Sequence, residues 1–276
     1  MTPPKYIYRY QPPTIYALSN LSEAKLWFSD PASFNDPFDC LSDSIIASCE
    51  AGLKTMDAPT ALEIAMGVSH DIPEALTALS SKTEGEIIRV ATNAIRIGMT
   101  QAILKKRGVC CFSENRDDLL MWAHYADSHR GFCLEFDTSF APFSEQNRFR
   151  PIDYRVTLPA LDLKRLAERD HDQLLEFLHT KASCWKYERE WRALHREPNT
   201  KFGYDRAALN SIYFGAKMGF DQIEMICSLL DRTNTRLFKM SLDINSFQLS
   251  ASEFKYTPID FRVNTTAISQ LNSATS

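Results

Sequence analysis

The sequence has few glycines and no apolar run long enough to cross a bilayer. Only nine glycines occur in 276 residues, and the one candidate for a phosphate-binding loop, residues 214–219, lacks the required spacing. A membrane-spanning helix needs about 20 apolar residues. The first ten residues also lack the basic-then-apolar order of a signal peptide. These absences argue against a P-loop nucleotide site and a membrane partner, and they predict a cytoplasmic protein.

The cysteines and charges exclude further classes of protein. Seven cysteines is an odd number, and neither Cys-x-x-Cys nor His-x-x-x-His occurs, so we expect free thiols in a reducing compartment. The formal net charge is −4 at pH 7. General binding to nucleic acid favours a basic surface. We therefore do not expect the protein to bind nucleic acid generally.

The densest group of aromatic and titratable residues lies in residues 107–137. Short apolar runs at 109–112 and 132–136 predict two strands, and residues 119–126 between them carry no helix breaker. Asn115 and Asp117 stand where N-capping residues belong. Gly131 is expected to relieve the backbone where the helix ends. The pattern predicts strand, helix, strand.

The rest of the chain predicts one α+β domain over residues 1–263. Residues 5–10 alternate, so that Tyr6, Tyr8 and Tyr10 share one face of a strand and Ile7 and Arg9 the other. Alanine, leucine and glutamate dominate residues 42–106, which predicts a helical insertion into a mixed or antiparallel β core. Further helices are expected at 14–21, 83–106, 161–180 and 220–231, and further strands at 26–29, 152–156, 211–215, 237–242 and 246–256. Residues 264–276 are expected to form a flexible tail.

Two motifs carry polar side chains that could form a site. In the loop at residues 34–39, we expect Phe34 and Phe38 to be buried and Asp39 to cap backbone amides or hold a basic side chain. Residues 185–192 predict a strand, which would point Glu188, Glu190 and Arg192 to one face. That face is either a solvated ladder of charges or the lining of a cleft.

Several motifs together resemble a bacterial family catalogued as domain of unknown function 2971. The resemblance covers roughly residues 5–220, in the expected order. It is carried by Tyr8-Arg9-Tyr10, residues 34–39, Cys111-Phe112-Ser113, Met121-Trp122-x-His124-Tyr125, Gly131 and Trp185-x-x-Glu188-x-Glu190-Trp191-Arg192. The family name implies no activity.

The chain also resembles the ADP-ribosyltransferases, through Arg9 on the first strand, Ser29 at the end of the second and the late Glu-x-Glu motif. This resemblance implies a split β core and NAD as the substrate. Arg9 would hold a phosphate of NAD, Ser29 or Ser113 would support the glutamate, and Glu190 would bind the nicotinamide ribose. Glu188 would orient or deprotonate an unknown acceptor. We expect Tyr10, Trp122, His124 and Tyr125 to contact the nucleotide.

Two alternatives remain open. A metal-assisted hydrolase or nuclease would draw its ligands from His124, His129, Asp36, Asp39, Asp117 and Asp118. A binding or sensor module would use the same motifs only as structure. The sequence therefore predicts an NAD-dependent ADP-ribosyltransferase-like enzyme, with a metal-assisted hydrolase or nuclease and a non-catalytic binding or sensor module as the alternatives.

Overall fold

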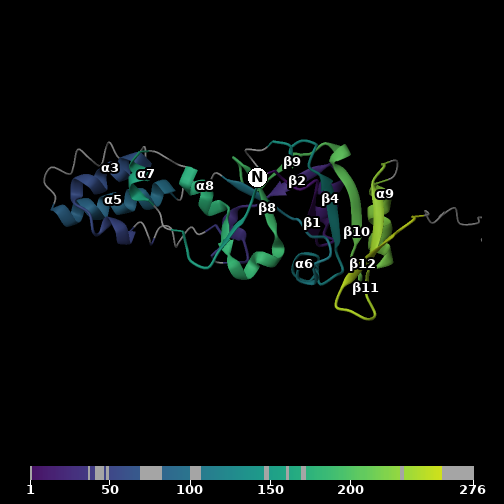
Figure 1. Ribbon diagram of the computed structural model, residues 1–276. Coiled ribbons are helices and arrows are strands. Elements are labelled where there is room, and N and C mark those ends of the chain that lie inside the picture. Colours follow the sequence, from purple (N-terminus) through teal and green to yellow (C-terminus); the bar gives the residue numbers. More distant parts are fainter. Residues whose placement is uncertain are drawn as a thin grey trace, which may run out of the picture.

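A computed structural model describes residues 2–36, 38–40, 47, 50–68, 83–99, 107–145, 149–159, 162–168, 172–230 and 233–256. Its largest element is a mixed eight-stranded sheet with the order β12-β11-β10-β4-β1-β3-β8-β5 (Figure 1). The strands are β1 (Tyr6–Gln11), β3 (Gly108–Ser113), β4 (Phe132–Asp137), β5 (Phe149–Pro151), β8 (Glu190–His195), β10 (Leu209–Phe214), β11 (Arg236–Leu242) and β12 (Leu249–Glu253). With the helices beside it, this sheet confirms the predicted α+β class.

Helices cover both faces of the sheet, and the side chains of β1 alternate between these two faces as predicted. Ile7 lies in a core with apolar residues of α1 (Ile15–Ser22) and α9 (Phe220–Leu229). Tyr8 and Tyr10 lie in a different core with residues of α6 (Leu119–Tyr125). The central strand β4 is buried on both faces. The α1 helix is capped by the Thr14 side chain, at the predicted position.

A helical region lies beside the sheet and has its own apolar core. It contains α3 (Ala58–Val68) and α5 (Glu84–Met99), together with α7 (Leu163–Ala167) and α8 (Asp172–Leu178) (Figure 1). Its core includes Ile64, Ile95, Leu163 and Phe177. Helices therefore occur within 42–106 as predicted, whereas the helix expected at 161–180 is two short helices. The parts of the insertion at 42–46, 69–82 and 100–106, and the expected tail at 264–276, lie outside the described residues.

Smaller sheets complete the fold. Strand β2 (Lys25–Phe28) pairs with β9 (Thr200–Gly203), and β6 (Asp153–Arg155) pairs in parallel with β7 (Thr180–Ala182). Ser29, just after β2, forms an isolated bridge with Val109 of β3. The predicted strand at 26–29 therefore exists, and this bridge is its backbone pairing with the main sheet among the described residues.

The ladder between β1 and β3 is interrupted. These two neighbours are paired only at Tyr8 and Ser113, whereas β1 follows β4 along its whole length. Beyond Tyr8, the Arg9 guanidinium donates to the backbone carbonyl of Cys111 across the gap. A side chain thus takes the place of ladder hydrogen bonds, which leaves room for a cavity between the two strands.

Three local predictions were wrong. Residues 183–188 form a 3₁₀ helix, η3 (Ser183–Glu188), and the strand begins only at Glu190. Phe38 is 55% exposed instead of buried. The α6 helix is capped by Asp118, not by Asn115 or Asp117.

Gly131 also has a different role from the one predicted. The left-handed conformations after α6 belong to Asp127, Ser128 and His129, and no described glycine has a positive φ. A Cβ at Gly131 would instead collide with the backbone carbonyl of Gln11 and with the backbone of Ala126. Glycine is therefore required there because two backbone segments approach closely.

Candidate functional site

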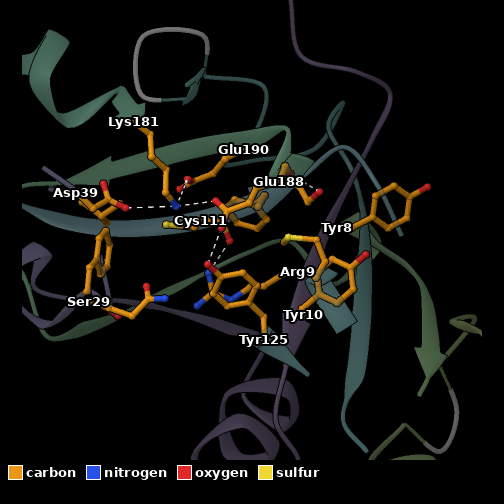
Figure 2. A pocket seen from close by; sticks show the side chains of 16 residues that line it. Tyr8, Arg9, Tyr10, Ser29, Asp39, Cys111, Tyr125, Lys181, Glu188 and Glu190 are labelled. Atoms are coloured by element: carbon orange, nitrogen blue, oxygen red, sulfur yellow. Dashed lines mark hydrogen bonds and ion pairs between the residues drawn. The ribbon is translucent and has the colours of Figure 1, made fainter. Parts of the chain in front are cut away.

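A cavity of about 210 Å³ opens at the interruption between β1 and β3 (Figure 2). Its walls come from β1, β3, α6, β7, the segment 188–190 and the loop after β2. The lining residues are Tyr8, Arg9, Tyr10, Ser29, Phe34, Asn35, Asp39, Val109, Cys111, Phe112, Ser113, Met121, Tyr125, Lys181, Glu188 and Glu190. Segments more than 150 residues apart in the sequence thus meet around one small volume.

The cavity brings together most of the residues selected from the sequence. Arg9, Ser29, Tyr125 and Glu190 line it, as predicted. The predicted reason was wrong, because β3 lies between β1 and β8 and because β2 belongs to a separate sheet. Tyr10, Glu188 and Ser113 line it as well. The cleft interpretation of the Glu-x-Glu segment is therefore the correct one, and the solvated ladder is excluded because Glu188 and Glu190 are both buried.

Arg9 supplies a positive charge that is not paired with any described carboxylate. Its guanidinium donates to the Cys111 carbonyl at 3.1 Å and the Trp27 carbonyl at 3.4 Å, and it also contacts the Cys110 thiol. No described carboxylate lies within ion-pair distance of it. A half-buried guanidinium held by neutral groups keeps its full charge available to an anionic ligand.

Three buried carboxylates surround Lys181 on the other side of the cavity (Figure 2). The Lys181 ammonium lies 2.6 Å from Glu188, 3.2 Å from Glu190 and 3.4 Å from Asp39. Each of these side chains is at most 5% exposed. Buried charges of this kind are tolerated because each one has an opposite charge in hydrogen-bond contact.

Arg192 completes the ion cluster on the side away from the cavity. It is fully buried, and its Nε donates to Glu190 at 2.6 Å while Nη2 donates to Asp39 at 2.8 Å. Its Nη1 donates to the Leu178 carbonyl at 2.8 Å. The cluster therefore joins the sheet to the helical region. Asp39 holds a basic side chain, as one of its two predicted roles required.

The local backbone explains why both glutamates face the cavity. Glu188 ends η3, Arg189 takes the left-handed conformation with φ 45°, and Glu190 starts β8. The Ser113 hydroxyl donates to the Glu188 carbonyl at 2.6 Å and fixes this turn. Between the two candidate serines, Ser113 is the one bonded to the glutamate segment, while Ser29 pairs with β3 through its backbone.

The environments of the two glutamates move their pKa values apart. Burial acts to raise the pKa of Glu190, but the charges of Arg192 and Lys181 outweigh it and hold this pKa at about 2. For Glu188, burial prevails over the charge of Lys181, with a further contribution from Glu190, and the pKa is raised. Glu190 is thus a permanent anion, and Glu188 is the carboxylate suited to exchanging a proton.

Tyr125 and Cys111 are protonated groups beside these carboxylates. The Tyr125 hydroxyl donates to Glu188 at 2.6 Å, and its pKa is raised by burial and by the Glu188 charge. Burial and the Glu190 charge likewise raise the pKa of the Cys111 thiol. Both groups can donate hydrogen bonds within the cavity, and neither is an anionic nucleophile at neutral pH.

Two residues predicted to contact a nucleotide do not line the cavity. Trp122 is fully buried, stacks on His129 and donates to the Arg116 carbonyl at 2.7 Å. His124 is exposed on α6. Trp122 is therefore part of the core. Its burial is tolerated because its indole N–H donates to a backbone carbonyl of its own segment.

The candidate metal ligands are dispersed. Asp118 caps α6, Asp36 accepts from the Phe38 amide, and Asp39 is bound to Arg192 and Lys181. Within the described part of the chain, no three His, Cys, Asp or Glu side chains are grouped so that they could hold a metal ion.

Sequence reasoning missed Lys181 altogether and placed Arg192 on the correct face without a role. Lys181 lies seven residues before Glu188 and on a different element, so no periodic pattern relates the two. The nearest signal was the excess of carboxylates at Glu188 and Glu190, which require cations if they are buried.

One comparison with known proteins gave a match. A family model described as "Protein of unknown function (DUF2971)" matches residues 121–193, from α6 to β8. The match supports the resemblance to that family over less than half of the chain. No curated protein and no solved structure matches, so the resemblance to ADP-ribosyltransferases stays a prediction. None of the described helices is long and apolar enough to cross a membrane.

Proposed function

We propose that the cavity binds NAD and that the protein is an ADP-ribosyltransferase-like enzyme, which transfers ADP-ribose from NAD to an acceptor. The observation that carries the proposal is the division of charge in one small cavity. Arg9 has no carboxylate partner among the described residues, and two buried glutamates lie across from it. A diphosphate and a sugar that becomes cationic would each find the opposite charge.

Each step has a residue suited to it. Arg9 holds the diphosphate, and the aromatic rings of Tyr10 and Tyr125 offer flat surfaces to the nucleotide. Nicotinamide leaves with the electron pair of the C–N glycosidic bond. Glu190, ionised at any physiological pH, lies close to the positive charge that develops on the ribose.

Glu188 takes the proton of the acceptor. As the acceptor atom attacks the ribose carbon, its proton passes to the Glu188 carboxylate, whose raised pKa favours this transfer. Attack by water on the same ribose carbon gives NAD hydrolysis, which depends less on Glu188 because the proton of water is also released to solvent. Any other acceptor gives an ADP-ribosylated product.

The test is nicotinamide released from NAD by the purified protein, with and without cell extract as a source of acceptor. Arg9→Gln should raise KM or abolish release, and Arg9→Lys should restore part of the activity. Glu188→Gln should spare hydrolysis more than transfer. Glu190→Gln should abolish release, and its folding is checked by circular dichroism because it leaves Arg192 short of a partner.

Three results would contradict the proposal. Absence of both NAD binding and nicotinamide release at millimolar NAD would reject it. Hydrolytic activity that needs a divalent metal would favour a hydrolase instead. Absence of activity in all of these assays would favour a binding or sensor module.

A further inference from the structure

The two cations of the buried cluster share Glu190 and Asp39, but they differ in their contact with Glu188. Arg192 donates to Glu190 and Asp39 through separate nitrogens, so these two anions keep a partner when Lys181 is removed. Glu188 receives nothing from Arg192. Within the described residues, its only cation is Lys181, at 2.6 Å.

We infer that Lys181 is a positioning residue that governs whether Glu188 carries a proton, and so whether the cavity contains a base. This inference deepens the proposed function and rests on it for its kinetic consequence. The effect of Lys181 on the protonation of Glu188 does not depend on the reaction, because it concerns one buried carboxylate and one buried ammonium in direct contact. Lys181 itself is held in place by its contacts with Glu190 and Asp39, and it lies over the ring of Trp185.

The surroundings of Glu188 leave Lys181 as the controlling charge. The ionisable groups that act most directly on Glu188 are Lys181 of β7, Glu190 of β8, Tyr125 of α6, Tyr187 of η3 and Tyr154 of β6. One of these is a carboxylate that repels a second negative charge, and three are neutral phenols. Arg9 of β1, Cys111 of β3 and Asp39 of the loop after β2 line the same cavity, and no hydrogen bond or ion pair joins any of these three described side chains to Glu188. Without the Lys181 ammonium, Glu188 would be a buried anion beside another anion and would take up a proton.

The direction of the effect is fixed by this geometry. Removing an opposite charge at hydrogen-bond distance makes the ionised form of Glu188 less favourable, so its titration moves to higher pH, by about 1–3 pH units for a contact of this kind. A base that is already protonated cannot accept the proton of an acceptor. Lys181→Met should therefore move the acidic limb of the pH profile of nicotinamide release to higher pH.

Infrared spectroscopy tests the inference without any assumption about the reaction. The C=O stretch of a protonated carboxyl is followed against pH in the wild type, in Lys181→Met and in Lys181→Met/Glu188→Gln. We expect the band to appear at higher pH in Lys181→Met than in the wild type, and this change to be absent from the double variant. Lys181→Arg should restore the wild-type titration.

Two further variants keep the test decisive. Lys25→Met removes a lysine from a surface ion pair with Glu23 and should leave unchanged both the pH profile and the part of the band that Glu188→Gln removes. Tyr125→Phe removes the other donor to Glu188 and should move the titration in the same direction, which keeps the test open if Lys181→Met does not fold.

The outcomes separate the two claims. An unchanged titration in Lys181→Met, or a shifted band that persists in the double variant, would overturn the inference whatever the enzyme does. A shifted band together with absence of nicotinamide release would leave the inference standing and reject the proposed function.

Discussion

At the scale of single residues, the cavity depends on a small set of buried charges that stabilise one another. Arg192 is the most buried of them and makes the most contacts. A buried ion pair adds little net stability relative to apolar residues, but removing one partner leaves the other charge unpaired. The charges are therefore individually indispensable even where the cluster as a whole is not strongly stabilising.

Arg192→Leu should lower the free energy of unfolding by about 3–5 kcal/mol, because Asp39 and Glu190 would remain buried with only Lys181 between them. Urea unfolding followed by circular dichroism measures this change. Lys25→Met is the control, since its partner Glu23 is on the surface, where solvent screens the ion pair and the expected loss is small. Equal losses in the two variants would show that burial of the cluster has no energetic consequence.

His179 should make the protein less stable in mild acid. Burial lowers its pKa to about 4, so the folded state keeps the ring neutral while the unfolded chain takes up a proton below pH of about 6.5. The unfolded state then binds more protons, and stability falls as pH falls from about 6.5 to about 4. The contribution is on the order of 3 kcal/mol.

His179→Asn keeps a donor toward the Leu175 carbonyl, which the ring contacts through Nδ1 at 2.8 Å, but it does not titrate. Unfolding curves at several pH values should show a smaller loss of stability in the variant between these limits. Glu188, whose raised pKa acts in the opposite direction, is common to both proteins. Parallel pH dependences would contradict the prediction.

The sequence revealed the site residues only in part, for a physical reason. Arg9 and Glu190 were found because a strand pattern gives the direction of its side chains. Glu188 faces the cavity through the left-handed turn at Arg189, not through the strand predicted there. Lys181 and the role of Arg192 were not found, because an ion pair between separate elements leaves no periodicity in the chain. Trp122 was misplaced because an aromatic residue on a short helix fits a core or a ligand equally well.

At the scale of elements, tight contacts between backbone segments are as important as caps and periodicity. Gly131 lies where the end of α6 meets β1, and a side chain there has no space. Gly85, in the first turn of α5, has no described atom beyond its chain neighbours and its own helix backbone within 4 Å of the position that a Cβ would take. The two glycines therefore offer a matched comparison of steric crowding and helix propensity.

Gly131→Ala should destabilise the protein by several kcal/mol, because the atoms that the new Cβ meets belong to the backbone and cannot move independently. Gly85→Ala should stabilise it by about 0.5–1 kcal/mol through the higher helix propensity of alanine. Thermal and urea unfolding of both variants check the signs. A neutral Gly131→Ala would show that the close approach is relieved at little cost.

The elements that could be predicted were those with a clear period. The alternation in β1, the Thr14 cap of α1 and the apolar run of β4 all gave correct elements. The segment 183–188 did not, because an aromatic and charged sequence without glycine or proline gives no sign of a 3₁₀ turn. The left-handed conformation of Arg189 is imposed by tertiary contacts, including the hydrogen bond between Ser113 and the Glu188 carbonyl.

At the scale of the whole molecule, the sheet has a protected centre and an open edge. Strand β4 lies between β1 and β10, and all but its last residue are buried. Strand β12 ends the sheet, and all but its first residue are exposed. The apolar core of the helical region is separate from the cores on the two faces of the sheet.

Hydrogen exchange should follow this arrangement. The amides of β4 and β1 should exchange slowest, at rates set by global unfolding, and the amides of β12 should exchange much faster. Exchange measured by mass spectrometry on overlapping peptides gives the order. Slower exchange in α3 and α5 than in β4 would show that the helical region, not the sheet, is the most stable unit.

The thiol of Cys111 gives the cavity a reporter of its own occupancy. Cys111 lines the cavity and is partly exposed, and its raised pKa makes it slow to alkylate. Cys184 is exposed and supplies a fast internal reference. Any molecule that fills the space between Arg9 and Glu190 should shield Cys111 from a maleimide without changing the labelling of Cys184, with Cys111→Ser as the blank. Ligands of this protein can therefore be sought by protection of one sulfur atom, before any reaction has been identified.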